Sequence, residues 1–120
     1  MAKKILVVDD EKDFLKAITI RLDHAGYDTC VAIDGQEAFD CLDKENPDLI
    51  ILDIQMPKMD GLGFIRKLKK DSKFKDIPII FLTAGAFDIA EEVGTLASAQ
   101  DFLLKSVDNE QIIDRVAKLI

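Results

Sequence analysis

The sequence has no long hydrophobic run. Nowhere in its 120 residues does an apolar stretch approach the roughly 20 residues of a membrane-spanning helix. The first four residues lead directly into the apolar segment at residues 5–8, which is too short for the core of a signal peptide and lacks a small-residue cleavage site. An apolar fraction of 48% and a charged fraction of 32% are typical of soluble globular proteins. We therefore expect a cytoplasmic protein without membrane contact.

Positive charge is also in short supply. Lys and Arg number 16 against 23 Asp and Glu, and the formal net charge is −7. Nucleic-acid binding depends on clustered Lys and Arg beside the phosphates, and such proteins have a basic balance. We therefore expect no direct nucleic-acid partner.

Cysteine and histidine are scarce. Cys30 and Cys41 are 11 residues apart, no C-x-x-C motif occurs, and the chain has one histidine. This pattern argues against a zinc site or a disulfide. The interpretation that fits best is a pair of buried, reduced thiols that act as small hydrophobic side chains.

Short aliphatic runs alternate with helical patterns along the whole chain. The runs lie at residues 4–8, 28–32, 48–52, 77–82 and 101–104, and three of them are almost unbroken hydrophobics, as expected of strands covered on both faces. Helical stripes lie between and after them. The stripe positions are Phe14, Ala17, Ile18, Leu22 and Ala25; Ala38, Cys41 and Leu42; Phe64, Ile65 and Leu68; and Ile112, Ile113, Val116 and Ile120.

Helix boundaries are marked by acidic residues. Asp34 with Glu37, and Asp108 with Gln111, have the spacing of N-terminal caps. A further helix within residues 87–98 has a weak pattern, because Gly94 lies inside it and its apolar side chains are small.

Strands alternating with helices predict βαβ units with right-handed crossovers and a parallel sheet. The expected fold is α/β, a three-layer doubly wound sheet with helices on both faces, and one domain spans residues 1–120. Such sheets bind ligands beyond the carboxyl ends of their strands. The residues at those ends are therefore the candidates for function.

Four of the five predicted strands end in a reactive or charged side chain. The first ends in Asp9-Asp10-Glu11, the third in Asp53, the fourth in Thr83 and the fifth in Lys105. Carboxylates that share a small site repel one another, so one stays protonated or a hard cation binds among them. Mg²⁺ suits a site with few carboxylates and a phosphate ligand. Asp53 as nucleophile, with a cation, a lysine and a hydroxyl, predicts a phosphoryl-transfer site that forms an aspartyl phosphate.

Four motifs resemble the receiver domain of two-component response regulators. They are "VDD" at residues 8–10, "DIQMPKMDG" at 53–61, "TA" at 83–84 and "DFLLK" at 101–105, in the order and at the spacing of that family. The resemblance covers the whole chain. It implies a flavodoxin-like five-stranded parallel sheet of order 2-1-3-4-5.

The resemblance also implies a role for each motif residue. Asp53 would accept a phosphoryl group from the phosphohistidine of a sensor histidine kinase or a histidine phosphotransfer protein. Mg²⁺, or Mn²⁺ in its place, would be bound by Asp10, by Asp9 mainly through water, by Asp53 and by the backbone carbonyl of Gln55. The chain would thereby catalyse its own phosphorylation and dephosphorylation, without turnover of a conventional substrate.

Other residues would convert phosphorylation into a signal. By the family pattern Lys105 would contact the phosphate and Thr83 would move towards it. Phe102 would be the switch aromatic whose burial follows Thr83, or else an ordinary core residue of a buried strand. The signal would pass to a downstream protein target or into a phosphorylation-linked homodimer. The first helix, with Phe14, Ala17 and Ile18, is where family members meet their kinase, although part of this face must also serve the core.

The sequence departs from the family pattern in three places. Ser106 follows Lys105 where the family usually has proline, and a cis bond before a residue other than proline costs about 3 kcal/mol, so we expect a trans bond. Ser98 stands where many members have glycine. Gln55 and Gly85 occupy positions that influence dephosphorylation in the family.

Other classes fit less well. The acidic turn at residues 9–11 would repel the phosphate of a flavin, no G-x-x-x-x-G-K-[ST] motif is present, and a haloacid-dehalogenase-type phosphatase has D-x-D after its first strand. The remaining alternative is a pseudo-receiver, which would act as a phosphorylation-independent protein-interaction module. The last predicted helix ends with the chain at Ile120, so we expect no output domain here, whether the protein is a stand-alone receiver or a fragment of a longer regulator.

Overall fold

A computed structural model of the protein describes residues 2–53, 55–56, 59–83, 101–104 and 108–120. The strands are β1 (Lys4–Val8), β2 (Asp28–Ala32), β3 (Leu49–Asp53), β4 (Gln55–Met56), β5 (Met59–Asp60), β6 (Ile79–Thr83) and β7 (Asp101–Leu104). The helices are α1 (Lys12–His24), α2 (Gly35–Glu45), α3 (Gly61–Lys70) and α5 (Asn109–Leu119).

The main sheet has five parallel strands in the order β2-β1-β3-β6-β7. This order is the predicted 2-1-3-4-5 once the short strands β4 and β5 are set aside. Every residue of the central strand β3 is buried, which explains its unbroken hydrophobic composition up to Asp53. The fold class inferred from the alternating pattern is therefore confirmed.

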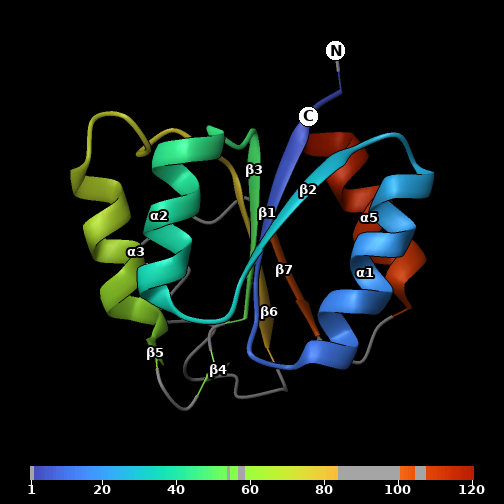
Figure 1. Cartoon of the computed structure of the whole chain (residues 1–120), viewed down its shortest axis with the longest axis horizontal. Helices are drawn as coiled ribbons and strands as arrows, with labels where there is room; N and C mark the ends of the chain where they lie inside the picture. Colours follow the sequence, from blue (N-terminus) through green and yellow to red (C-terminus); the bar gives the residue numbers. More distant parts are fainter. Residues whose placement is uncertain (1, 54, 57–58, 84–100, 105–107) are drawn as a thin grey trace.

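Helices cover both faces of this sheet. Figure 1 shows α2 and α3 on one side and α1 and α5 on the other, with the strands seen edge-on between them. One apolar cluster joins α2 and α3 to the sheet through side chains such as Leu42, Phe64 and Leu68. A second cluster joins α1 and α5 to the opposite face through Ile18 and Val116, among others. Each face therefore has its own hydrophobic core.

The predicted N-terminal caps are present. The Asp34 carboxylate accepts the backbone N–H of Glu37 at 2.9 Å, and the Glu37 carboxylate accepts the N–H of Ile33 at 3.1 Å. At the start of α5, the Asp108 carboxylate accepts the N–H of Glu110 at 2.9 Å. Each cap satisfies an amide that has no partner within its helix, which explains why the chain turns at these residues.

Two local expectations need correction. In α1 the buried positions are Leu15, Ile18 and Leu22, whereas Ala17 and the C-cap residue Ala25, which we assigned to the apolar stripe, are exposed. The longer side chain of Leu15 lies one turn before Ile18 and fills the contact with the sheet. Cys30 and Cys41 are free thiols, as expected, but both are half-buried rather than fully buried.

A short hairpin was not anticipated. Gln55 and Met56 of β4 pair with Asp60 and Met59 of β5 in an antiparallel ladder, where the sequence suggested only a stiff loop before α3. The expected helix at residues 87–98 and the bond between Lys105 and Ser106 lie outside the described residues. Within the described part of the chain, no helix combines the length and apolar character needed to cross a membrane.

Candidate functional site

The candidate site lies where β1 and β3 end side by side. Val8 and Leu52 are register partners, so the residues that follow them, Asp9 and Asp53, stand at the same edge of the sheet. In Figure 1 this is the lower edge, towards which β4 and β5 also lie. The exposed fraction is 0% for Asp9 and 4% for Asp53, whereas Asp10 is exposed. Two buried carboxylates and one exposed carboxylate therefore meet at this edge.

Asp9 also shapes the backbone at the end of β1. Its N–H donates to the carbonyl of Ala32 at 3.0 Å, which continues the β1–β2 ladder by one bond. Its Oδ1 atom accepts the N–H of Glu11 at 2.9 Å, the geometry of a turn closed by an Asp side chain. Glu11 is the N-cap residue of α1 and makes no side-chain cap of its own. The Asp9 carboxylate therefore helps to start α1, a role that we did not predict.

The structure brings Asp9, Asp10 and Asp53 together. One carboxylate oxygen from each lies within 4.8 Å of the other two. At such separations each like-charged pair repels by on the order of 1 to 4 kcal/mol, depending on the local dielectric. A divalent cation among these oxygens would convert that repulsion into attraction, and hard oxygen ligands are those that Mg²⁺ prefers. The donor set therefore fits the metal implied by the sequence.

The backbone places three further predicted residues relative to this cluster. Asp53 is the register partner of Leu82, so Thr83 follows at the end of the strand beside it. Thr83 in turn pairs with Leu104 of β7. Phe102 lies within β7 opposite Phe81, and Gln55 belongs to the hairpin that follows Asp53. The carboxyl ends of β1, β3, β6 and β7 thus lie along one edge, as the parallel topology requires.

Lys105, which follows Leu104 in the sequence, lies outside the described residues, and so does Gly85. Their contribution to the site therefore stays a prediction. Among the first-helix residues that we linked to a kinase, Ala17 is exposed, Phe14 is half-buried and Ile18 is fully buried. A partner that contacts this helix meets Ala17 and part of Phe14.

A family comparison identifies the chain. The model of the response regulator receiver domain matches residues 5–117. This is nearly the whole sequence and includes every predicted site residue. The chain belongs to the response regulator receiver domain family. The receiver assignment made from the four motifs is thus confirmed, and it places the chain in two-component signalling.

Curated relatives support the same assignment. The receiver is 40% identical over 119 residues to the probable transcriptional regulator ycf27 of Cyanophora paradoxa, an alignment that covers 98% of this chain and 48% of the relative. The ycf27 protein of Guillardia theta is 39% identical over 119 residues, with 98% of this chain and 45% of the relative covered. The chain thus spans about half the length of these relatives.

Solved structures share the fold over the full length of the receiver. The chemotaxis response regulator CheY4 of Vibrio cholerae superposes with a TM-score of 0.90 at 29% identity, and each chain is covered completely. The receiver domain of a response regulator from Bermanella marisrubri gives a TM-score of 0.91 at 31% identity, with 99% and 98% of the two chains covered.

Proposed function

We propose that this receiver accepts a phosphoryl group on Asp53 from the phosphohistidine of a sensor histidine kinase or a histidine phosphotransfer protein. The observation that carries the proposal is the convergence of Asp9, Asp10 and Asp53, whose carboxylate oxygens lie within 4.8 Å of one another. Of the three, Asp53 alone stands at the end of the central strand β3, directly beside the strand that ends in Thr83. It is therefore the carboxylate that can meet an anion bound between the strand ends.

The proposed metal ligands include the three carboxylates of this cluster. Asp10 would bind Mg²⁺ directly, Asp9 mainly through water, and Asp53 and the backbone carbonyl of Gln55 would complete the protein ligands, with Mn²⁺ as a substitute. Bound Mg²⁺ would neutralise charge on the phosphoryl oxygens. Asp9 suits a less direct role, because its Oδ1 atom already accepts the Glu11 N–H.

Transfer to Asp53 breaks one bond and forms one. A carboxylate oxygen of Asp53 attacks the phosphorus atom, the phosphorus–nitrogen bond of the phosphohistidine breaks, and the imidazole leaves with the bonding electrons and takes up a proton. Such a reaction needs mainly an in-line nucleophile and charge neutralisation. Lys105 would supply a fixed positive charge, and Thr83 would supply a hydroxyl donor to a phosphoryl oxygen.

The same residues would return the domain to its resting state. Hydrolysis of the aspartyl phosphate needs a water in line with the bond that joins phosphorus to Asp53. Asp53 is 4% exposed, so access of that water depends on the residues around it. Gln55 and Gly85 hold the positions that govern this access in the proposal. Gly85 has no side chain to shield the phosphoryl group from water, and the glutamine at position 55 would offset this.

Phosphorylation would then change the domain's contacts. The new group adds about −1.5 to −2 charge beside Thr83 and Lys105 and creates contacts that only the phosphorylated state can make. Movement of Thr83 and burial of Phe102 would carry the change to a downstream protein target or a phosphorylation-linked homodimer. In this proposal the protein works in the cytoplasm and touches neither membrane nor nucleic acid directly.

Intact-mass measurement with a small phosphodonor tests the proposal. We expect acetyl phosphate with Mg²⁺ to add one phosphoryl group to the wild type and none to Asp53→Asn. Omission of Mg²⁺ should abolish the adduct in the wild type. Absence of an adduct despite measured Mg²⁺ binding would instead support the pseudo-receiver alternative, in which the chain binds partners without phosphorylation.

A further inference from the structure

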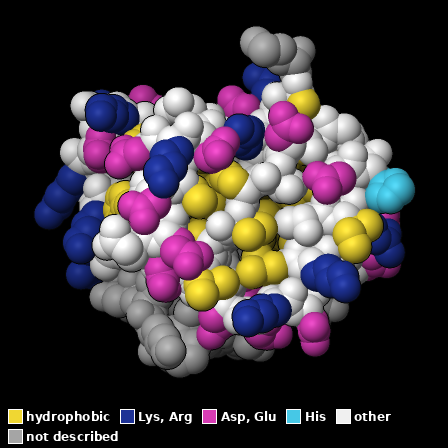
Figure 2. All heavy atoms as spheres, in the orientation of Figure 1, with side chains coloured by type: hydrophobic (Ala, Val, Ile, Leu, Met, Phe, Trp, Pro, Cys, Tyr) yellow, Lys and Arg dark blue, Asp and Glu magenta, His cyan; other side chains and the backbone are white. Residues whose placement is uncertain are grey.

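The outer edge of the sheet carries exposed apolar side chains. In the part of the chain that the structure describes, β2 is the outermost strand on this side. Val31 within it is 44% exposed and Ile33 just beyond it is 41% exposed. Figure 2 shows hydrophobic side chains gathered over this strand, at the centre of the face. Proteins usually protect such an edge with charged side chains or cover it with another element, so its exposure here indicates a use.

The backbone of β2 also has a side that faces away from the sheet. The Asp28 N–H donates at 2.9 Å to the carbonyl of Lys3, which precedes β1, and the Ala32 carbonyl accepts at 3.0 Å the N–H of Asp9, which follows β1. Alternate residues of a strand direct their backbone groups to opposite sides, so Thr29 and Val31 direct theirs outward. The Val31 carbonyl accepts the Cys41 thiol at 3.6 Å, a weak bond to sulfur. A neighbouring strand would therefore find backbone partners at Thr29 and Val31.

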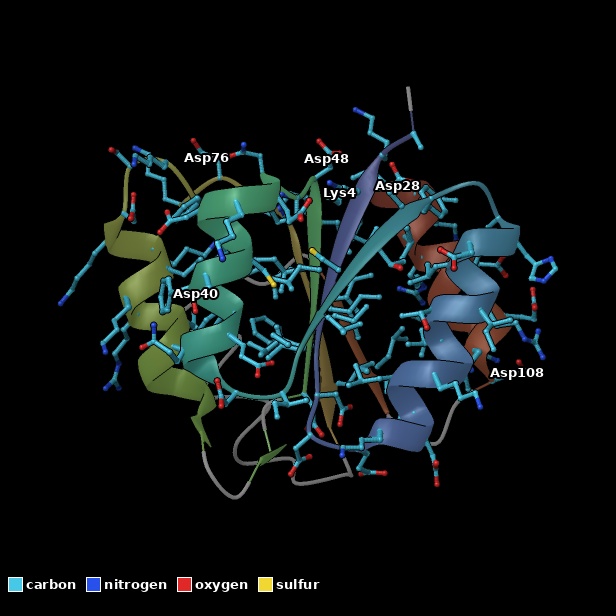
Figure 3. The ribbon with its side chains drawn as sticks, viewed as in Figure 1. Lys4, Asp28, Asp40, Asp48, Asp76 and Asp108 are labelled. Carbon is cyan, nitrogen blue, oxygen red and sulfur yellow. The ribbon has the colours of Figure 1, made fainter. Side chains whose placement is uncertain are left out.

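A shallow, acidic hollow adjoins this edge. It has a volume of about 180 Å³ and lies between β2 and α2. Its lining consists of the apolar Val31 and Cys41, the carboxylates of Glu37, Asp40 and Glu45, and the ammonium of Lys44. The Glu45 carboxylate is already paired with the Lys4 ammonium at 2.5 Å, which leaves the carboxylates of Glu37 and Asp40 against the ammonium of Lys44. This balance favours a positively charged occupant. Figure 3 labels Asp40, which is exposed on α2.

We propose that the outer edge of β2 docks an extended segment of a partner protein in which apolar residues alternate with arginine or lysine. The segment pairs its backbone with Thr29 and Val31, the mode by which edge strands capture peptides. Its apolar side chains cover Val31 and Ile33. One basic side chain enters the hollow, where its aliphatic stem lies on Cys41 and its charge meets Asp40.

A second copy of the chain is a poorer occupant. Each copy has a formal net charge of −7 and would bring the same carboxylates to the shared edge. Like charges that face each other across an interface oppose association. The docking surface uses Thr29, Val31 and Ile33 of the outermost strand and none of Asp9, Asp10 and Asp53, so it does not rest on phosphoryl transfer to Asp53.

Binding of a designed peptide to the full chain tests the proposal. The probe is a short fluorescent peptide that alternates arginine and valine, and its matched control carries glutamate in place of arginine. We expect saturable binding of the arginine peptide, measured by fluorescence anisotropy at physiological salt, and none of the glutamate peptide. Backbone amide shifts on binding should be largest at Thr29 and Val31.

Two pairs of variants test whether binding depends on the proposed surface itself. One pair controls for a change of charge elsewhere on the chain, and the other controls for a change at an exposed apolar side chain elsewhere. Asp40→Lys should weaken binding by about fivefold, while Asp43→Lys, an equal charge change at an exposed position outside the hollow, should weaken it less than about twofold. Val31→Pro removes an outward N–H that the β1 ladder does not use, and it should weaken binding by about tenfold. Ile20→Thr, at an apolar side chain on α1 that is 48% exposed, should leave binding unchanged.

The outcomes decide the proposal even if one variant is unstable. Circular dichroism identifies any unfolded variant. If Val31→Pro is unfolded, the comparison of Asp40→Lys with Asp43→Lys is sufficient to test the proposal. Equal weakening by these two changes would overturn the proposal, as would amide shifts that centre on another surface. A concentration-dependent dimer of the chain alone, mapped to β2, would show that a second copy covers the edge and would equally overturn it.

Discussion

Asp9 directly follows β1, and Asp53 is the last residue of the neighbouring parallel strand β3. One carboxylate oxygen of each lies within 4.8 Å of the other and of a carboxylate oxygen of Asp10. Both are almost completely buried, so their mutual repulsion is poorly screened by solvent. An arrangement of this kind costs stability unless a cation or a hydrogen bond compensates for it. The stability of the metal-free domain therefore depends on the same three carboxylates that would bind the metal.

We predict that Asp10→Asn weakens Mg²⁺ binding by about tenfold while it raises the metal-free stability by about 0.5 kcal/mol. The variant loses a ligand charge, but it also loses two repulsive pairs at an exposed position. Urea unfolding with EDTA and with saturating Mg²⁺ measures both effects. A metal-free variant that is less stable than the wild type would show that the three carboxylates do not repel in the folded state.

Asp9 should show two separable roles. Asp9→Asn keeps an oxygen that can accept the Glu11 N–H, whereas Asp9→Ala loses both this acceptor and the charge. In EDTA we expect Asp9→Ala to be less stable than Asp9→Asn by about 1 kcal/mol, the usual cost of losing such a bond at a helix start. Both variants should weaken Mg²⁺ binding. Equal unfolding free energies of the two variants would contradict a stabilising role for the hydrogen bond between Asp9 and Glu11.

The start of α2 should depend on Asp34. Its carboxylate accepts the Glu37 N–H at 2.9 Å, so Asp34→Ala should lower the free energy of unfolding by about 1 kcal/mol. Asp43→Ala, on an exposed position of the same helix, is the matched control and should change it by less than about 0.5 kcal/mol. Thermal or urea unfolding of the three proteins makes the comparison. Similar losses in both variants would mean that charge rather than capping is responsible.

The stability of the protein at alkaline pH should depend on the thiol of Cys30. Burial raises the pKa of its thiol from the ordinary 9.0 to about 12, and the neighbouring Cys41 adds to the shift. Between these values the folded state retains a proton that the unfolded chain has released. Its contribution to stability is therefore complete below about pH 9 and is lost as the pH rises towards 12.

Urea unfolding at a series of pH values tests this. Stability should fall with rising pH in that window, and Cys30→Ala should reduce the slope. A hydrogen bond to Glu45 is the main cause that raises the pKa of Lys4, whose contribution is also lost at high pH. Lys4 and Glu45 are present in both proteins, so this main part of the slope is common to them. Identical slopes for wild type and Cys30→Ala would contradict the assigned thiol pKa.

The sequence predicted the sheet well because its strands are buried on both faces. The runs at β1 and β3 are continuous hydrophobics with a charge directly after or at the end, and this contrast marks the edge of the sheet without any knowledge of packing. The helix caps at Asp34 and Asp108 could also be predicted from the sequence, because capping depends on residues that are close together in it.

Features that depend on contacts between residues far apart in the sequence could not be predicted from the sequence. Leu15 rather than Ala17 faces the core because the sheet selects which side of α1 is buried. The half-burial of Cys30 and Cys41 follows from the position of β2 at the sheet edge, which no local pattern shows. The predicted proximity of Asp9, Asp10 and Asp53 did hold, because parallel strands deliver their carboxyl ends to one edge.

Locating the phosphoryl group tests the central claim most directly. The protein is treated with acetyl phosphate and Mg²⁺, the acyl phosphate is reduced with borohydride, and the reduced residue is identified by peptide mass mapping. Our account predicts conversion of Asp53 to homoserine, dependent on Mg²⁺ and absent from Asp53→Asn. Reduction at Asp9 or Asp10 in the wild type, or an unmodified Asp53 in protein that binds Mg²⁺, would contradict it.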